Sequence, residues 1–135
     1  EVNIDQGNQY IIFSDMSEII NINNIETLKM IKVTAIIKSD NKIPIIIKSD
    51  NANYNNLNHN TIFTSNVSIE YLNNKIYSEK IDLNFENMVV KITENVKYEG
   101  PYGLVKSDNI VIDLIKKKAN IFMNNETEKV KIDKK

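Results

Sequence analysis

Few residues of this chain have a type and spacing that could support catalysis. His59 is the only histidine, and it stands in an Asn-rich segment without a nucleophile or an acid placed to serve it. We therefore expect a solvent-facing side chain with no catalytic role. Cysteine is absent, which excludes thiolate chemistry and disulfides. No nucleophile elbow, Gly-rich phosphate loop or spaced His/Cys/Asp ligand set occurs, so the sequence predicts no enzyme activity, no metal and no cofactor.

Acidic residues recur at a constant step of 29 residues, at Asp50, Glu79 and Asp108. Paired carboxylates can carry out acid–base chemistry, and a column of carboxylates could hold metal ions. One acid per repeat at an identical position indicates a structural role first. Such a residue commonly accepts hydrogen bonds from turn amides.

These acids belong to a repeated phrase. The phrase occupies three segments at the same step: Ile47–Tyr54, Ile76–Leu83 and Val105–Ile112. A second phrase repeats with the same step at Thr64–Ile69 and Thr93–Tyr98, and a looser copy of the first lies at Ile12–Ile19. A fixed period of this size indicates one supersecondary unit, stacked so that neighbours bury each other's apolar faces.

Within the repeats, apolar residues alternate with polar ones, which is the strand period. Ile81, Leu83 and Phe85 share one face, and one period later Ile110, Ile112 and Leu114 hold the matching positions. Two further apolar columns keep the period: Phe63, Ile92 and Ile121 form one, and Val67, Ile69, Tyr71, Val96 and Tyr98 form the other.

Linkers between the strands are regular as well. We expect them at 55–58, 86–87 and 116–118, with hairpin turns at 73–74 and 100–103. The segment Ser17–Leu28 is predicted to be extended or irregular rather than helical, because its apolar residues are poorly spaced for one helical face and Asn23-Asn24 favours a turn. Each repeat is thus two strands, with repeats near 10–36, 43–71, 76–98 and 104–132. The sequence predicts a single all-β domain, 1–135, built as an open twisted β-jellyroll of stacked antiparallel β-repeats.

Composition restricts the partners of this domain. The 135 residues carry a net charge of −1, with lysines and acids interspersed. Nucleic-acid binding usually requires a concentrated basic stripe, which is not found. No stretch approaches the roughly 20 apolar residues of a membrane-spanning helix. The sequence begins with Glu1, so we expect that an N-terminal anchor or signal could precede it.

The segment Ile43–Tyr54 resembles the opening of the OstA-like periplasmic lipopolysaccharide-transport domains. There, an apolar strand runs into a small residue, an acid and an alternating strand ending in Tyr. Asn66-Val67 and Asn95-Val96 are similar to the Gly-Asn-Val step of that group, and the likeness covers 43–123. Ser65 and Glu94 replace the glycine of that step, so we expect a different local turn geometry at these positions.

Within this group, the chain is more similar to LptC-like than to LptA-like proteins. Some forty residues with an additional β-repeat precede Pro44, and the closing phrase Asp113–Met123 also looks LptC-like. The resemblance implies a non-catalytic protein that relays lipopolysaccharide from an inner-membrane ABC transporter to an LptA-like periplasmic bridge protein. It implies a periplasmic location, with a tether to the inner membrane by an N-terminal helix upstream of Glu1.

The same resemblance implies where cargo and partners bind. Acyl chains of lipid A would lie between two splayed sheets, lined by Phe63, Val67, Ile69, Ile81, Leu83, Phe85, Val90, Ile92, Ile110 and Ile112. Sheet edges would serve as docking surfaces. The transporter would meet Tyr10, Ile12 and Ser14, and the next bridge unit would meet Ile121, Met123, Val130 and Ile132. The edges could also pair with a second copy of the chain.

Other interpretations stay open at this point. The chain could be an LptA-like soluble bridge unit, or a ligand-free β-solenoid scaffold or adhesin segment whose apolar columns simply form a packed core. A hydrolase on a β-fold would require a convergent polar site, which the sequence does not show. Periodicity alone does not distinguish a lipid-binding interior from a packed one.

Overall fold

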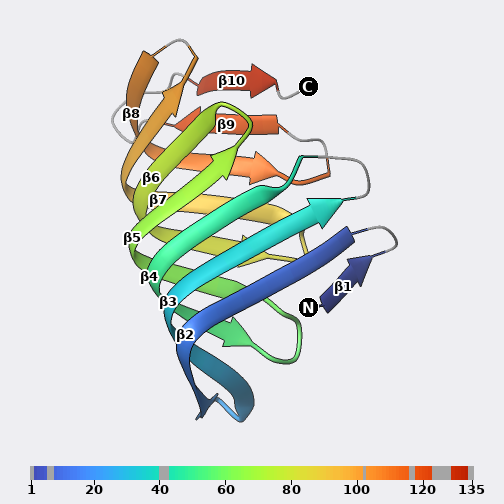
Figure 1. Ribbon diagram of the computed structural model, residues 1–135. Helices are drawn as coiled ribbons and strands as arrows, with labels where there is room; N and C mark the ends of the chain where they lie inside the picture. The colour runs from blue at the N-terminus through green and yellow to red at the C-terminus, as the bar shows by residue number, and fades with distance from the viewer. Residues whose placement is uncertain are drawn as a thin grey trace.

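The computed structural model describes residues 2–5, 8–39, 43–101, 103–115, 118–122 and 129–133. Ten strands make up one antiparallel sheet in which each strand pairs with the next along the chain (Figure 1). The strands are β1 (Val2–Asp5), β2 (Asn8–Ile22), β3 (Ile25–Ser39), β4 (Ile45–Asn55), β5 (Thr61–Tyr71), β6 (Asn74–Asn84), β7 (Val89–Gly100), β8 (Gly103–Asp113), β9 (Lys118–Phe122) and β10 (Lys129–Asp133). The sheet is open, and the part of the chain that is described contains no helix. The predicted all-β fold, an open twisted β-jellyroll, is thus confirmed.

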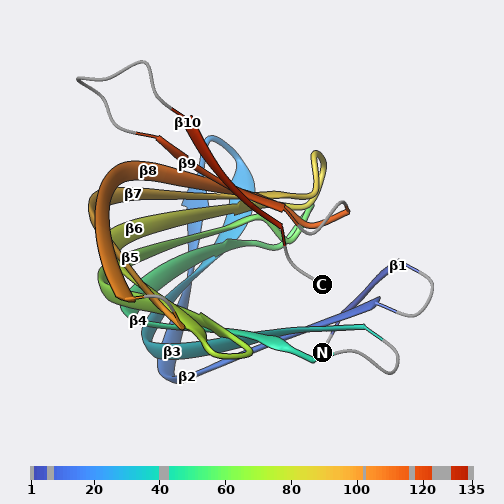
Figure 2. The same cartoon turned by 90° about the horizontal axis from the view of Figure 1, so that it is seen from above.

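The sheet folds over on itself, because its long strands bend midway (Figure 2). We call the two halves leaf A and leaf B. Leaf A comprises 8–14, 33–39, 45–48, 67–71, 74–78, 96–100 and 103–107. Leaf B comprises 16–22, 25–31, 51–55, 61–64, 80–84, 89–93 and 109–113. The acyl-binding interpretation placed the interior between two splayed sheets. Instead, one continuous sheet supplies both layers, and each long strand belongs to both.

A line of β-bulges marks the bend. The register shifts between Lys48 and Asn51 where β4 meets β5, and equivalent shifts follow at each of the next three strand pairs. An extra residue in one strand of a pair bends that strand and increases the local twist. The bulges recur with the sequence period, which explains why the sheet bends along one line.

On β5 and β7 the bulge uses left-handed residues. Ser65 and Asn66 have φ of 68° and 50°, and Glu94 and Asn95 have φ of 67° and 56°. The expectation of a different geometry at Ser65 and Glu94 is therefore wrong. Both residues adopt a positive φ, which glycine reaches more easily than any other residue. The adjacent Asn in each pair tolerates this region better than most residues.

On the alternate strands a serine stabilises the bend. The Ser49 hydroxyl donates to the carbonyl oxygen of Asn51 at 2.9 Å, and the Ser78 hydroxyl donates to that of Lys80 at 3.2 Å. Ser14 makes the same bond to Met16 at 2.9 Å, so the looser copy of the phrase in β2 repeats the local structure as well as the sequence. The repeated Ser-acid step is the bend of each even-numbered strand from β2 to β6.

The turns follow the sequence closely. Asn23 and Asn24, with φ of 52° and 64°, form the two-residue turn between β2 and β3. The segment predicted to be extended or irregular is thus the end of a hairpin, with strands on both sides of the turn. Positive φ at both turn residues is typical of a type I′ turn, which matches the twist of the flanking strands. A second two-residue turn, Leu72-Asn73, joins β5 to β6.

Candidate functional site

The inner faces of the two leaves form the candidate site. Each residue predicted to line an acyl-binding interior points inward and belongs to the core or packs against it. Phe63, Ile81, Leu83, Val90, Ile92 and Ile110 are fully buried, Val67, Ile69 and Phe85 are buried, and Ile112 is half-buried. The predicted columns are thus brought together on one surface, while their role in lipid binding stays a prediction.

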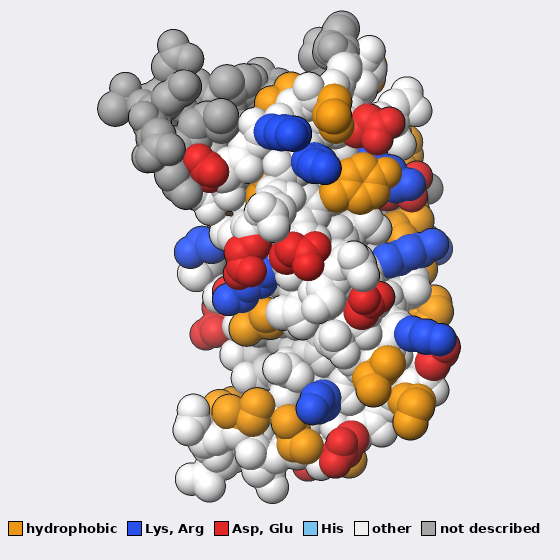
Figure 3. Space-filling view, turned by 90° about the vertical axis from the view of Figure 1, so that its left-hand side faces the viewer, with side chains coloured by type: hydrophobic (Ala, Val, Ile, Leu, Met, Phe, Trp, Pro, Cys, Tyr) orange, Lys and Arg blue, Asp and Glu red, His pale blue; other side chains and the backbone are white. Residues whose placement is uncertain are grey.

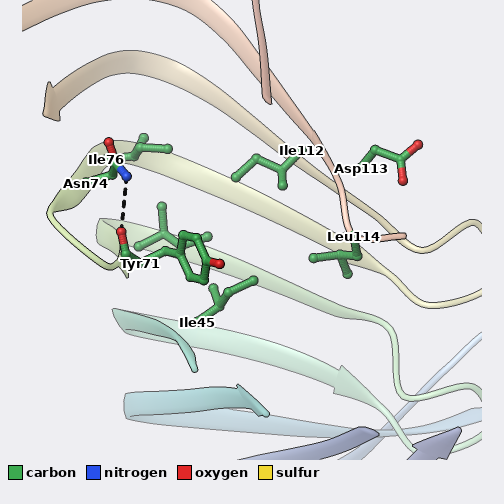
Figure 4. A pocket seen from close by; sticks show the side chains of 8 residues that line it. Ile45, Tyr71, Asn74, Ile76, Ile112, Asp113 and Leu114 are labelled. Carbon is green, nitrogen blue, oxygen red and sulfur yellow. Dashed lines mark hydrogen bonds between the residues drawn. The ribbon is translucent and has the colours of Figure 1, made fainter. Parts of the chain in front are cut away.

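A pocket opens between the leaves (Figure 4). Leaf A contributes Ile45, Ile69, Tyr71, Asn74 and Ile76, while Ile112, Asp113 and Leu114 come from the end of β8 in leaf B and the residue after it. Ile69 and Ile112 were predicted as lining, whereas Ile45 and Ile76 were missed. The sequence carried a signal for Ile76, because it begins the second copy of the repeated phrase and matches the buried Ile47.

The rim of this pocket is polar and bonded. The Tyr98 hydroxyl donates to the side-chain oxygen of Asn74, whose amide donates to the Tyr71 carbonyl oxygen at 3.3 Å. Burial raises the pKa of Tyr98, so the hydroxyl keeps its proton. Gly100 makes room for this ring, since a Cβ there would stand 2.4 Å from a Tyr98 ring carbon.

Tyr10 closes the interior away from the pocket. Its side chain is fully buried, and its hydroxyl lies 2.8 Å from the Thr61 hydroxyl across the interior, on leaf B. Its ring centroid lies 4.8 Å from that of Phe85 and 6.3 Å from that of Tyr54. Burial raises the pKa of Tyr10. Tyr10 was predicted to belong to a partner-docking edge, but its side chain instead packs inside, against residues at the ends of β4, β5 and β6. Docking at this edge stays a prediction.

The pocket between the leaves is small. Its volume is about 40 Å³. A cavity of this kind needs about 10–15 Å³ to hold one water molecule, so the pocket has room for a few waters but not for an extended acyl chain. A chain of the length found in membrane lipids can enter only if the leaves separate. The geometry thus provides an apolar mouth but not a preformed lipid cavity.

The sheet edges are only partly as predicted. β1 pairs with β2 from Asn8 to Tyr10, so the edge that the described strands leave unpaired begins at Ile11. Ile12 packs against the core and Ser14 bonds within its own strand, whereas Phe13, Met16 and Ile19 are exposed. At the other end β10 is the last strand of the sheet. Ile121 of β9 pairs with Val130, and Ala119 pairs with Ile132. Met123 lies outside the described residues.

His59 is not idle. It is half-buried, and its Nδ1 lies 2.5 Å from the Tyr54 hydroxyl, with the two ring centroids 5.7 Å apart. The histidine fixes the 55–60 loop against the core, so the expectation of a solvent-facing side chain is wrong. No nucleophile shares this contact among the described residues.

The repeated acids lie at the bend. Asp50 accepts a 2.7 Å hydrogen bond from the side-chain amide of Asn66, the left-handed residue of the neighbouring strand. Turn amides were predicted as the donors, and at Asp50 the donor is a side-chain amide from the adjacent bulge. Seen from the bend side, acids, lysines and apolar side chains are interspersed (Figure 3). No group of three His, Cys, Asp or Glu in the described parts could hold a metal ion.

The comparisons with known proteins add no relative. No family model matches the sequence. A search of curated proteins likewise finds no match. Within the described residues, there is also no helix long and apolar enough to cross a membrane.

Proposed function

We propose that this chain binds acyl chains of lipopolysaccharide between its two leaves and relays them across the periplasm, from an inner-membrane ABC transporter to an LptA-like bridge protein. The observation that supports this function best is the apolar pocket between leaf A and leaf B, with its polar rim. The sequence resemblance to LptC-like proteins supports the same cargo.

An open sheet is suited to reversible loading. The leaves are covalently continuous at the bend, and elsewhere they meet mainly through apolar side chains, with the Tyr10–Thr61 hydrogen bond as a polar contact. Acyl chains entering between them would exchange one set of apolar contacts for another, so little of the hydrophobic stabilisation would be lost. A closed barrel would have to break a hydrogen-bonded strand pair to admit the same chain.

The open edges suit transfer between proteins. From Ile11 to Ile22, β2 has no partner on its outer side among the described residues. A strand of another protein can add to such an edge through main-chain hydrogen bonds. In this proposal the transporter adds to β2 and the bridge protein adds to β10, so that one apolar interior runs through neighbouring proteins.

A ligand-free scaffold is the second candidate, and one observation favours it. The inward side chains form a buried apolar cluster, and the pocket at its mouth has a volume of only about 40 Å³. A solid core is what a β-repeat scaffold requires. A soluble LptA-like bridge unit would share the fold and the interior, so it differs from the first proposal in its tether and not in its site.

Photocrosslinking to purified lipopolysaccharide tests the proposal. A photoreactive residue at Ile112 faces the pocket, and one at Val111 faces outward from the same strand as a matched control. A third at Phe85 reports the deeper interior, with outward-facing Asn84 as its control. Crosslinks at Ile112 but not at Val111 are expected. No crosslink at any inward position, in protein shown to be folded, would favour the scaffold.

A further inference from the structure

Tyr10 occupies the space that a cargo chain would need. It comes from leaf A, near the start of β2, and its ring packs on Phe85 while its hydroxyl reaches Thr61 on leaf B. Phe85 is itself one of the residues predicted to contact an acyl chain. The hydrogen bond between Tyr10 and Thr61 is a polar link between the two leaves in this part of the interior.

The direction of this hydrogen bond follows from its neighbours. The Thr61 hydroxyl donates its one proton to the His59 carbonyl oxygen at 3.1 Å. Thr61 can therefore only accept from Tyr10, so the Tyr10 hydroxyl is the donor. Tyr10 is thus linked through Thr61 to the 55–60 loop. His59 holds this loop against Tyr54.

The interior is closed unequally along its length. Tyr10 and Phe63 are fully buried, whereas Ile112 and Leu114 at the pocket are only partly buried. An apolar chain that enters at the pocket thus meets packed aromatic side chains as it moves toward the N-terminal strands. Tyr10 comes from leaf A, whereas the aromatic side chains of Tyr54 and Phe63 come from leaf B.

We propose that Tyr10 is a displaceable plug, which fills the N-terminal half of the interior at rest and is expelled when an acyl chain enters from the pocket. This inference rests on the proposed function and adds the residue that regulates its site. The resting state then keeps the interior dry, and cargo binding must break the Tyr10–Thr61 hydrogen bond. The bond sets the affinity of the site without touching the pocket at its mouth.

Two substitutions alter the plug in the same direction. Tyr10→Phe keeps the ring but removes the hydrogen bond, so it should tighten the binding of myristate, a 14-carbon fatty acid, by about two- to tenfold. Thr61→Val should tighten binding further, because it leaves the buried Tyr10 hydroxyl without its acceptor. Tyr77→Phe removes an exposed hydroxyl on the outer face and should leave the affinity unchanged.

Displacement can be observed directly. In protein labelled with 3-fluorotyrosine, the ¹⁹F resonance of Tyr10 is the one that disappears in Tyr10→Phe. On saturation with myristate, and separately with lipid A, this resonance should move toward the position of the exposed Tyr77, while that of Tyr77 stays in place.

The outcomes separate the two proposals. If wild-type protein binds myristate but the Tyr10 resonance does not move and the variants bind equally, the plug is overturned and the lipid-binding function stands. Weaker binding by Tyr10→Phe would mean that the hydroxyl contacts the ligand, which also overturns the plug. If neither wild-type protein nor either plug variant binds myristate or lipid A, both proposals fail.

Discussion

At the scale of single residues, Phe63 and Ile62 show how completely strand alternation separates the two faces. They are neighbours on β5, yet Phe63 is 0% exposed and Ile62 is 38% exposed. Phe63→Ala should destabilise the fold by about 3–5 kcal/mol, since it removes a buried ring and leaves a cavity. Ile62→Ala, the matched control, should cost about 0.5 kcal/mol or less. Urea unfolding measures both, and similar losses would contradict the inward orientation of Phe63.

The left-handed bulge residues allow a stabilising change. Ser65 and Glu94 hold φ near 68° without being glycine. Replacing either with glycine removes the steric conflict of its Cβ and should stabilise the protein by about 1 kcal/mol, after allowing for the greater freedom of glycine in the unfolded chain. Glu94→Ala keeps the Cβ and should give no such gain. Thermal unfolding of the four proteins, including wild type, tests this, and equal melting temperatures for Glu94→Gly and Glu94→Ala would contradict it.

Buried tyrosines predict a loss of stability in alkali. Burial raises the pKa of Tyr10, Tyr54 and Tyr98 in the folded protein, whereas in the unfolded chain they ionise near pH 10. Below about pH 10 the tyrosines are protonated in both states, so stability there is fully present. Above it the unfolded state releases protons that the folded state retains, so stability falls as pH rises.

Tyr10→Phe isolates the contribution of one of these groups. The slope of unfolding free energy against pH should become shallower by up to about 1.4 kcal/mol per pH unit above pH 10. Tyr77→Phe, at an exposed position, should leave the slope unchanged. Urea titrations between pH 8 and 11.5 measure it, and an identical slope for Tyr10→Phe and wild type would mean that Tyr10 is not buried in solution.

At the scale of elements, β2 is an edge strand that displays apolar side chains. Phe13, Met16 and Ile19 are 55%, 66% and 64% exposed. From Ile11 onward, the outer edge of β2 pairs with no other described strand. Such an edge promotes pairing between chains, and lysine on an edge suppresses it. The double variant Met16→Lys, Ile19→Lys should therefore self-associate less at high concentration. Analytical ultracentrifugation measures this, with Lys at exposed Leu57, away from the edge, as the control. An unchanged mass distribution would show that the edge does not mediate self-association.

The strands and their inner faces could be predicted from the sequence, but the way the leaves cross could not. Alternation and the 29-residue period depend on local pairing, which fixes where Ile81 and Ile110 point. Tyr10 was misplaced because its environment depends on the bend and twist summed over several strands, which put β2 above residues about 50 to 75 positions later in the chain. Ile45 was missed for the same reason, since only leaf packing makes it part of a pocket, whereas the inward orientation of Ile76 could have been predicted from its match to Ile47. The exposure of His59 was predicted wrongly because contact with Tyr54 depends on the local loop conformation. His59 itself has a positive φ, which the sequence does not indicate.

At the scale of the whole molecule, every strand pairs only with its neighbours in sequence, so the repeat should be removable as a unit. Deleting residues 65–93 takes out one 29-residue period and joins Thr64 to Glu94, the residue that occupies the place of Ser65 in the next repeat. The strand formed at this junction keeps its left-handed bulge, and its apolar side chains still point inward. Leu114, which aligns with Phe85 one period later, would take the place of Phe85 against Tyr10. We expect a shorter chain that still unfolds cooperatively, at lower stability because less apolar surface is buried.

Deleting residues 65–92 instead is the control. It leaves one additional residue at the junction, so the inward side chains on one side of the junction turn outward. Circular dichroism with urea unfolding distinguishes these two chains. Folding of both, or of neither, would show that the period is not the structural unit of this sheet.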